Sequence, residues 1–155
     1  MIILGIDPGT HRIGYGVICK DKGTLSLVEA GLLPLEDGIP RLSAIERSLE
    51  VVLSRSRPDR AAMERLFFTR NQKTAISVAQ ARGVLLNTLQ KSGIPLQEFS
   101  PSEIKLAVAG SGTADKRAVA QMVFRFLSAR PNRLPDDVTD ALAIAITASG
   151  RRVDI

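Results

Sequence analysis

Cysteine, histidine and aromatic residues are scarce in this sequence, and their scarcity excludes several kinds of site. The 155 residues contain one cysteine, one histidine and no tryptophan, and only 4% are aromatic. A lone thiol, Cys19, cannot form an internal disulfide, and a zinc site built from several Cys and His ligands is excluded. Cys19 lies in an apolar run, where a small buried thiol is expected. His11 falls in a turn-like segment, and we assign it no role.

Long hydrophobic runs are also missing. The apolar stretches MIILGI and ALAIAITA are both much shorter than the roughly 20 residues that cross a bilayer. The first also has no basic leading segment, which a secretory signal would carry. We therefore expect a cytoplasmic protein without a membrane partner.

Positive charge is in excess. Lysine and arginine number 21 against 16 aspartate and glutamate residues, which gives a formal net charge of +5 and an isoelectric point near 9.9. Such a chain favours a polyanion such as nucleic acid, although positive charge can also serve solubility alone. With 155 residues and 45% hydrophobic content, the chain matches one globular domain, residues 1–155.

Apolar periodicity predicts an α/β protein, because short apolar runs indicate strands and a spacing of three and four indicates helices. The predicted strands are residues 2–6, 15–20, 24–33, 59–68 and 94–99, and the predicted helices are residues 40–54, 72–93, 101–109, 114–128 and 135–150. The first three strands suit an antiparallel meander. We therefore predict one mixed sheet with helices packed against it.

Two acidic residues follow apolar strand segments. Asp7 ends the first predicted strand, and Glu64 follows the apolar start of the fourth. A carboxylate at the end of a buried strand is costly to ionise unless a cation or hydrogen bonds compensate. Ordinary alternatives exist, since Asp7 would also suit a cap for the turn that follows it and Glu64 an exposed partner for an arginine.

Two further acids, Asp137 and Asp140, lie three residues apart at the start of the last predicted helix, and therefore on one face. Alone, such acids need only stabilise the helix dipole. Together with Asp7 and Glu64, they are predicted to meet at one edge of the sheet. Carboxylates at close range repel one another, so this site requires divalent cations, and hard oxygen ligands favour Mg²⁺ or Mn²⁺ over zinc.

These acids stand within a series of motifs that resembles a known family. In order along the chain the motifs are GIDPGT and GYGV, the glutamate of MERLFF, QARG, GSGTADK and PDDVTDALAIAIT. Over almost its whole length the chain resembles the RuvC family of bacterial crossover junction endodeoxyribonucleases. The resemblance implies an RNase H-like fold, with a mixed five-stranded sheet (three antiparallel strands, then two further strands) flanked by helices.

The resemblance also implies a Holliday junction resolvase whose catalytic, metal-binding carboxylates are Asp7, Glu64, Asp137 and Asp140. Asp136 is then a helix-start acid and not a ligand. Hydrolysis would use two metal ions, Mg²⁺ or Mn²⁺, and paired symmetric nicks would leave 5'-phosphate and 3'-hydroxyl ends in recombination and repair. The implied partners are four-way junction DNA, a second copy in a homodimer, and the branch-migration proteins RuvA and RuvB.

By the same resemblance, some residues are expected to hold the DNA. Lys105 and Lys116 would contact or neutralise phosphates near the cut, whereas without that context lysines are usually just solvated. Phe67 matches an aromatic that stacks on or wedges against junction bases. Core packing is the alternative for Phe67 or for its neighbour Phe68.

Other basic residues near these motifs are candidates for phosphate contacts, namely Arg70, Lys73 and Arg82. Helix packing is the alternative for the QARG motif that contains Arg82. Gly110 and Gly112 would let the backbone approach DNA closely.

Three other functions compete with this interpretation. GIDPGT also resembles the phosphate loop of the actin and sugar-kinase ATPases, but that superfamily needs a second half with its own phosphate loop. A junction-binding module without catalysis would use the basic surface and treat the acids as structural. Another RNase H-like nuclease would cut RNA in hybrids or other DNA structures.

Overall fold

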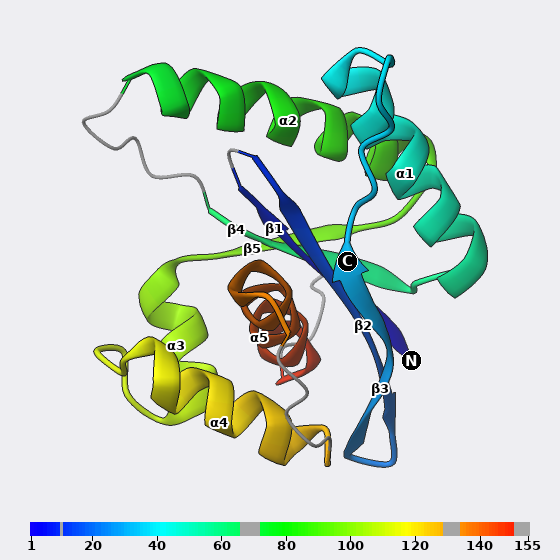
Figure 1. Cartoon of the computed structure of the whole chain (residues 1–155). Coiled ribbons are helices and arrows are strands. Elements are labelled where there is room, and N and C mark those ends of the chain that lie inside the picture. Colours follow the sequence, from blue (N-terminus) through cyan, green and yellow to red (C-terminus); the bar gives the residue numbers. More distant parts are fainter. Residues whose placement is uncertain (10, 66–71, 129–133, 151–155) are drawn as a thin grey trace.

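The structure is a computed structural model and describes residues 1–9, 11–65, 72–128 and 134–150. Its strands are β1 (Ile2–Pro8), β2 (Ile13–Asp21), β3 (Thr24–Leu32), β4 (Arg60–Glu64) and β5 (Leu96–Phe99). Its helices are α1 (Arg41–Ser56), α2 (Gln72–Lys91), α3 (Pro101–Ala109), α4 (Lys116–Phe126) and α5 (Asp136–Gly150). Figure 1 shows them arranged around one central sheet.

The sheet has five strands in the order β3-β2-β1-β4-β5. β1, β2 and β3 pair antiparallel, whereas β4 is parallel to β1 and β5 is parallel to β4. The predicted mixed sheet is therefore confirmed, with the antiparallel meander on one side and two parallel strands on the other.

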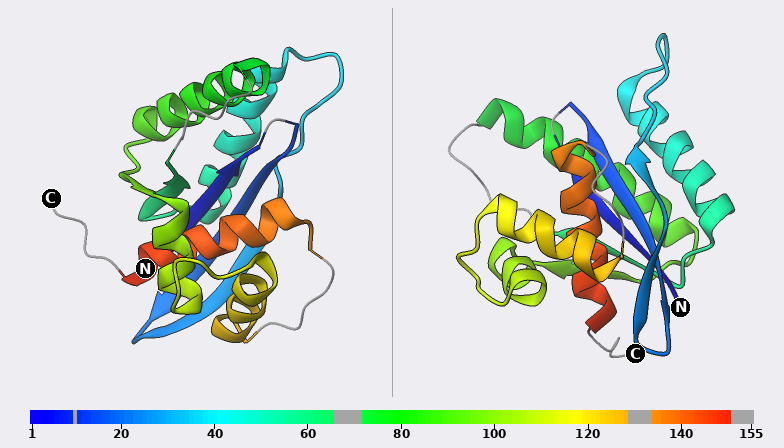
Figure 2. Two further views of the ribbon diagram at one scale, coloured as in Figure 1. Left: turned by 90° about the vertical axis from the view of Figure 1, so that its left-hand side faces the viewer. Right: turned by 60° about the horizontal axis from the view of Figure 1, so that its bottom comes forward.

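The central strands carry apolar side chains on both faces of the sheet, and helices cover both faces. One core cluster joins Leu4 and Ile6 of β1 to α1 and α2. The other joins Ile3 of β1 and Ala62 of β4 to α3, α4 and α5. In Figure 2 the sheet accordingly lies between α1 and α2 on one side and the three later helices on the other.

The predicted elements are all present, with ends that differ by a few residues. β1 does not end before Asp7 as predicted, because Asp7 pairs with Gly14 and Pro8 with Ile13 in the ladder to β2. α4 begins at Lys116 and not near residue 114, since the Asp115 side chain accepts a hydrogen bond from the Ala118 backbone amide at 2.7 Å and caps the helix.

The predicted start of α3 is confirmed in detail. Ser100 Oγ accepts from the Glu103 backbone amide at 3.3 Å, and the Glu103 carboxylate accepts from the Ser100 amide at 2.8 Å. This reciprocal capping fixes where the chain turns from β5 into α3, beside the end of β4. In the part of the chain that the structure describes, no helix is both long and apolar enough to cross a membrane.

Candidate active site

The strand pairing and side-chain alternation bring the predicted acids to one face of the sheet. Ile3 and Ala62 belong to the core on the α5 side, and alternation places Asp7 and Glu64 on the same side as these residues. Both acids lie at the carboxyl ends of adjacent parallel strands. Such ends meet at one edge of a sheet, where ligand sites commonly form.

Close packing of α5 on the sheet brings the other two acids to this edge. A β-carbon on Gly14 would overlap the Asp137 carbonyl oxygen, and one on Gly5 would overlap the Ala141 carbonyl oxygen. Only glycine leaves room for the α5 backbone to come this near to β1 and β2. Because Gly14 is paired with Asp7, the start of α5 is held directly beside Asp7.

The environment of Asp7 disfavours its charge. Burial, the largest cause, acts together with three neighbouring carboxylates to raise the pKa of Asp7 from its ordinary 3.8 to about 7. In decreasing order of effect, these neighbours are Asp140, Glu64 and Asp137. The positive charge of Lys116 opposes the shift. All four predicted acids therefore lie close enough to interact.

Glu64 and Asp140 are perturbed in the same direction. Burial raises the pKa of the Glu64 carboxyl, and the charge of Asp140 adds to the rise, while Lys105 and Lys116 oppose it. Burial also raises the pKa of Asp140, against the lowering effect of Lys116. Carboxyls that are buried together with like charges gain most from a bound cation.

Asp137 has a different neighbour, which sequence reasoning missed. Arg12 Nη2 lies 2.9 Å from Asp137 Oδ2, although that oxygen is buried and accepts no geometrically sound hydrogen bond from the described residues. An acceptor in this state suits a metal ligand. Arg12 lies two positions after the GIDPGT motif, so its basic charge beside a predicted acidic site was the available signal.

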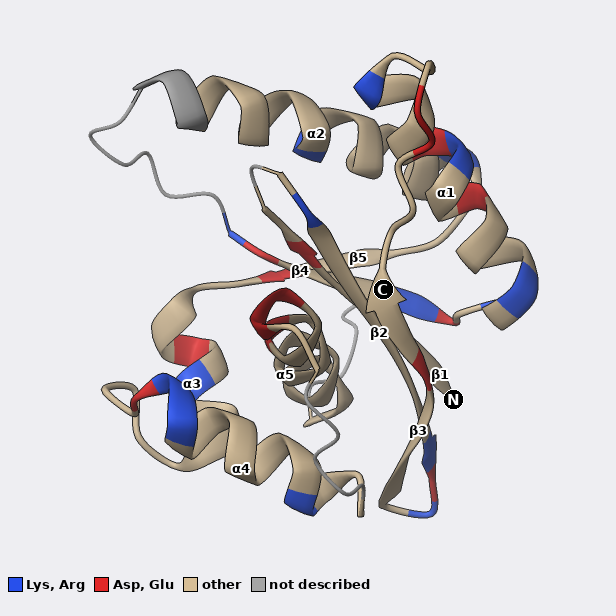
Figure 3. Cartoon of the chain, in the orientation of Figure 1, with Lys and Arg blue, Asp and Glu red and all other residues tan. Residues whose placement is uncertain are grey.

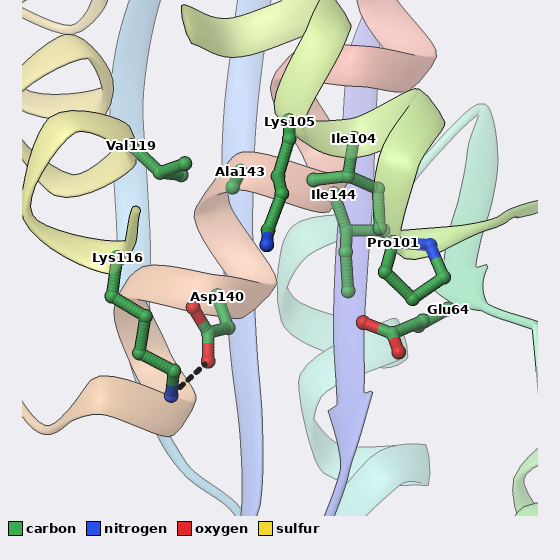
Figure 4. Close-up of a pocket in the computed structure, with 9 residues that line it drawn as sticks. All are labelled: Glu64, Pro101, Ile104, Lys105, Lys116, Val119, Asp140, Ala143 and Ile144. Atoms are coloured by element: carbon green, nitrogen blue, oxygen red, sulfur yellow. Dashed lines mark hydrogen bonds and ion pairs between the residues drawn. The ribbon is translucent and has the colours of Figure 1, made fainter. Parts of the chain in front are cut away.

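A pocket of about 200 Å³ opens between the acids and the two lysines. In Figure 4, Glu64 and Asp140 lie on opposite sides of the pocket, Lys105 points between them, and Lys116 bonds to Asp140. Its inner wall is apolar and comes from α3, α4 and α5 (Ile104, Val119, Ala143 and Ile144). In Figure 3, the acidic start of α5 and basic residues of α3 and α4 lie on the same side of the sheet.

The carboxylates fit divalent metal, but they do not form a finished cage. Among the described residues, no three Asp, Glu, His or Cys side chains converge on one point at coordinating distance. Three of the four carboxyls, those of Asp7, Glu64 and Asp140, have raised pKa values, and Asp137 Oδ2 is buried beside Arg12 without a sound hydrogen bond. Together the four side chains offer hard oxygen ligands.

Comparison with known proteins decides the family. A family model described as "Crossover junction endodeoxyribonuclease RuvC" matches residues 3–148. The chain belongs to the RuvC family. A RuvC from Chloroflexus aggregans is 48% identical over 149 residues, covering 94% of this chain and 91% of that protein. One from Prochlorococcus marinus is 45% identical over 150 residues, covering 95% and 97%.

A solved RuvC structure agrees with the fold. It is described as Thermus thermophilus RuvC in complex with Holliday junction substrate, and it has a TM-score of 0.88 and 34% identity. The match covers 96% of this chain and 93% of that one. The RNase H-like fold expected from the motifs is thereby confirmed, and RuvC membership makes the chain a nuclease of the class that uses divalent metal.

The structure places only some of the residues that were predicted to hold DNA. Lys105 and Lys116 both line the pocket beside the acids. Phe67, Phe68 and Arg70 lie outside the described residues, as does the side chain of Lys73 in α2. Gly110 adopts a left-handed conformation that ends α3, so it has a structural use as well.

The Arg82 side chain has partners inside the protein. The residue is only 7% exposed, and its guanidinium donates to the Glu64 backbone carbonyl and pairs with Glu98. These contacts favour the packing alternative for the QARG motif, and the phosphate contact of Arg82 stays a prediction. Sequence reasoning had no signal for Glu98 as the partner.

Proposed function

We propose that the protein is a Holliday junction resolvase, a metal-dependent endodeoxyribonuclease of one domain, residues 1–155, that nicks two symmetric strands of a four-way DNA junction. The observation that supports the proposal is that four carboxylates lie close enough to interact, beside Lys105 and Lys116. A site with paired negative and positive groups suits a metal-bridged phosphodiester. The junction-bound relative supports the choice of DNA structure.

Asp7, Glu64, Asp137 and Asp140 would hold two divalent ions, and their hard oxygens suit Mg²⁺, with Mn²⁺ as a substitute. When bound, such ions supply an activated water and stabilise the leaving oxygen at phosphorus. The chain therefore needs no nucleophilic side chain. We expect nicks with 5'-phosphate and 3'-hydroxyl ends, which a ligase can seal.

The chain's own cations would bind the DNA backbone around the cut. Lys116 Nζ lies 3.4 Å from Asp140 and 4.0 Å from Asp136, and its side chain is 74% exposed. An exposed lysine can exchange a carboxylate partner for a phosphate oxygen. Lys105 points into the same pocket from α3, and its charge opposes the rise in the pKa of Glu64. We further propose base stacking by Phe67 and a phosphate contact by Arg70.

Paired nicks require two active sites in a fixed relation, so we propose a homodimer with two-fold symmetry. The junction offers two strands of like polarity that such a dimer would cut together. We also propose that the resolvase works with the branch-migration proteins RuvA and RuvB. Sedimentation of the free protein, and of its mixture with either partner, tests these associations.

The function itself is tested by a comparison of substrates. A synthetic four-way junction, a plain duplex of the same sequence and an RNA–DNA hybrid are each incubated with Mg²⁺ or Mn²⁺. Preferential cutting of the junction supports the proposal. Preferential cutting of the hybrid or duplex would instead indicate another RNase H-like nuclease, and ATP binding with no cutting would indicate the phosphotransferase alternative.

A further inference from the structure

Arg82 connects α2 to the strand end that carries Glu64. Its Nη1 donates a hydrogen bond of 2.7 Å to the Glu64 backbone carbonyl, and its Nη2 pairs with Glu98 Oε1 on β5. The Arg82 side chain is 9% exposed and that of Glu98 is 39% exposed. The planar guanidinium of this largely buried arginine therefore bonds to two adjacent strands, β4 and β5.

The strand pairing explains why the Glu64 carbonyl needs this donor. The amide of Arg65 donates to Phe99 at the end of β5, and that of Ala61 donates to Pro95 just before β5. Alternation therefore directs the amide and carbonyl of Glu64 towards β1. The β1–β4 ladder ends one residue earlier, at the pair Ile6 and Met63. Arg82 thus takes the place of the missing strand partner where β1 and β4 separate.

Glu98 extends the same connection across the sheet. It pairs with Met63 in the β4–β5 register, one position before Glu64. Loss of Arg82 would leave a carbonyl without its donor and a carboxylate without its cation, and both losses occur at the end of β4. The Glu64 side chain leaves this same point towards the pocket on the opposite face of the sheet.

We propose that Arg82 is a positioning residue that holds the end of β4, and with it the Glu64 carboxylate, in the geometry that binds metal. The inference rests on the proposed function, since Glu64 is taken there as a metal ligand. Arg82 does not line the pocket and its side chain is only 9% exposed, so we infer that it acts through Glu64 and not on DNA. Residues that orient metal ligands in this way contribute about 10–100-fold to metal affinity or activity.

The test uses Arg82→Met and Arg82→Lys with Arg55→Met as a matched control. Arg55 also links a helix to a strand, since it pairs with Glu29 of β3 at 2.8 Å and donates to Tyr15 Oη at 3.3 Å. Three quantities are measured for each variant: the Mn²⁺-induced rise in melting temperature without DNA, the Mn²⁺ concentration for half-maximal junction cleavage, and the junction Kd in chelator at several salt concentrations.

We expect Arg82→Met to raise the half-maximal Mn²⁺ concentration about 10-fold or more and to reduce the Mn²⁺-induced stabilisation, with junction Kd within about twofold of wild type. Arg82→Lys should recover part of the loss, because lysine offers donors but no fork. Arg55→Met should lower the melting temperature and leave the Mn²⁺ response unchanged. Glu98→Gln, which keeps a hydrogen-bond acceptor, replaces Arg82→Met if that variant does not fold and should show a smaller loss of the same kind.

Two outcomes would overturn the inference. A lower melting temperature with an unchanged Mn²⁺ response would make Arg82 merely structural. A weaker Kd with a salt slope reduced by about one would make it a phosphate contact. Failure of the wild type to cut junctions would count against the proposed function alone. The Mn²⁺-induced stabilisation is measured without DNA, so it would still test whether Arg82 affects metal binding.

Discussion

Lys116 Nζ lies 3.4 Å from Asp140 Oδ2, so the first residue of α4 provides a cation for the first turns of α5. The contact raises the pKa of the Lys116 ammonium, chiefly through the charge of Asp140. The lysine therefore stays charged at neutral pH. Its position beside Asp140 in the pocket lining makes it a candidate for the proposed phosphate contact.

The first prediction concerns this lysine. Lys116→Met should slow junction cleavage by about 100-fold at saturating metal, because a charge directed at the reacting phosphate acts most strongly in the transition state. Junction Kd should change by less than about tenfold. The control is Lys91→Met, since Lys91 is also exposed and paired, with Glu46 at 3.0 Å, but lies at the far end of α2. Equal losses in both variants would contradict the assignment.

The second prediction separates adjacent acids. Asp137→Asn should reduce cleavage by at least about 100-fold, as expected for loss of a metal ligand. Asp136→Asn should stay within about threefold of wild type, because the Asp136 side chain is 82% exposed at the first residue of α5. Single-turnover cleavage in Mg²⁺ measures both. Comparable activity of the two variants would remove Asp137 from the metal site.

The third prediction concerns pH and stability. Asp7 has a folded-state pKa of about 7 against an ordinary 3.8, so between these values the folded protein holds a proton that the unfolded chain has lost. The free energy of unfolding of the metal-free protein should therefore fall as pH rises from about 4 to about 7. Asp7→Asn should add about 1–3 kcal/mol of stability at pH 8 and much less at pH 4.

Urea unfolding in chelator at the two pH values measures this difference. The exposed Asp21, at the end of β2, provides the control Asp21→Asn, for which we expect no such pH-dependent gain. Mn²⁺ should cancel the advantage of Asp7→Asn, because the wild-type carboxylate then has its cation. An equal gain at pH 4 and pH 8 would show that the charge of Asp7 is not the cause.

The fourth prediction concerns the contact between α5 and the sheet. Gly14→Ala should destabilise the fold by about 1–3 kcal/mol and reduce cleavage, because the added methyl overlaps the Asp137 carbonyl and displaces the start of α5. Gly83→Ala in α2 is the matched change, since a β-carbon there meets nothing within 4 Å. It should be neutral or stabilising. Stability and activity that are unaffected by Gly14→Ala would contradict the packing.

Much of the fold could be predicted from the sequence, because periodicity depends only on neighbouring residues. The capping of α3 by Ser100 and Glu103 is an example, since both partners lie within one turn. The predicted end of β1 was wrong because the polar Asp7 was taken to end the apolar run. Asp7 belongs to the strand because it pairs with Gly14 on β2, and the residues next to Asp7 do not indicate that pairing.

The site was only partly predictable for the same physical reason. The four acids were selected by strand ends, helix spacing and family motifs, and the structure brings them into electrostatic contact. The Arg82 side chain bonds to the Glu64 carbonyl where the β1–β4 ladder ends, and no local sequence pattern indicates that end. The contact of Arg12 with Asp137 likewise joins segments that meet only in the folded chain.

The central claim is tested most directly by cleavage of a synthetic four-way junction in which each strand is labelled in turn, by wild type and by Asp7→Asn, with Mg²⁺, Mn²⁺ or chelator. We predict that the wild type makes nicks at symmetric positions in two opposed strands only when metal is present. Asp7→Asn should bind the junction and leave it uncut. Tight binding by the wild type without cutting in either metal would contradict the account.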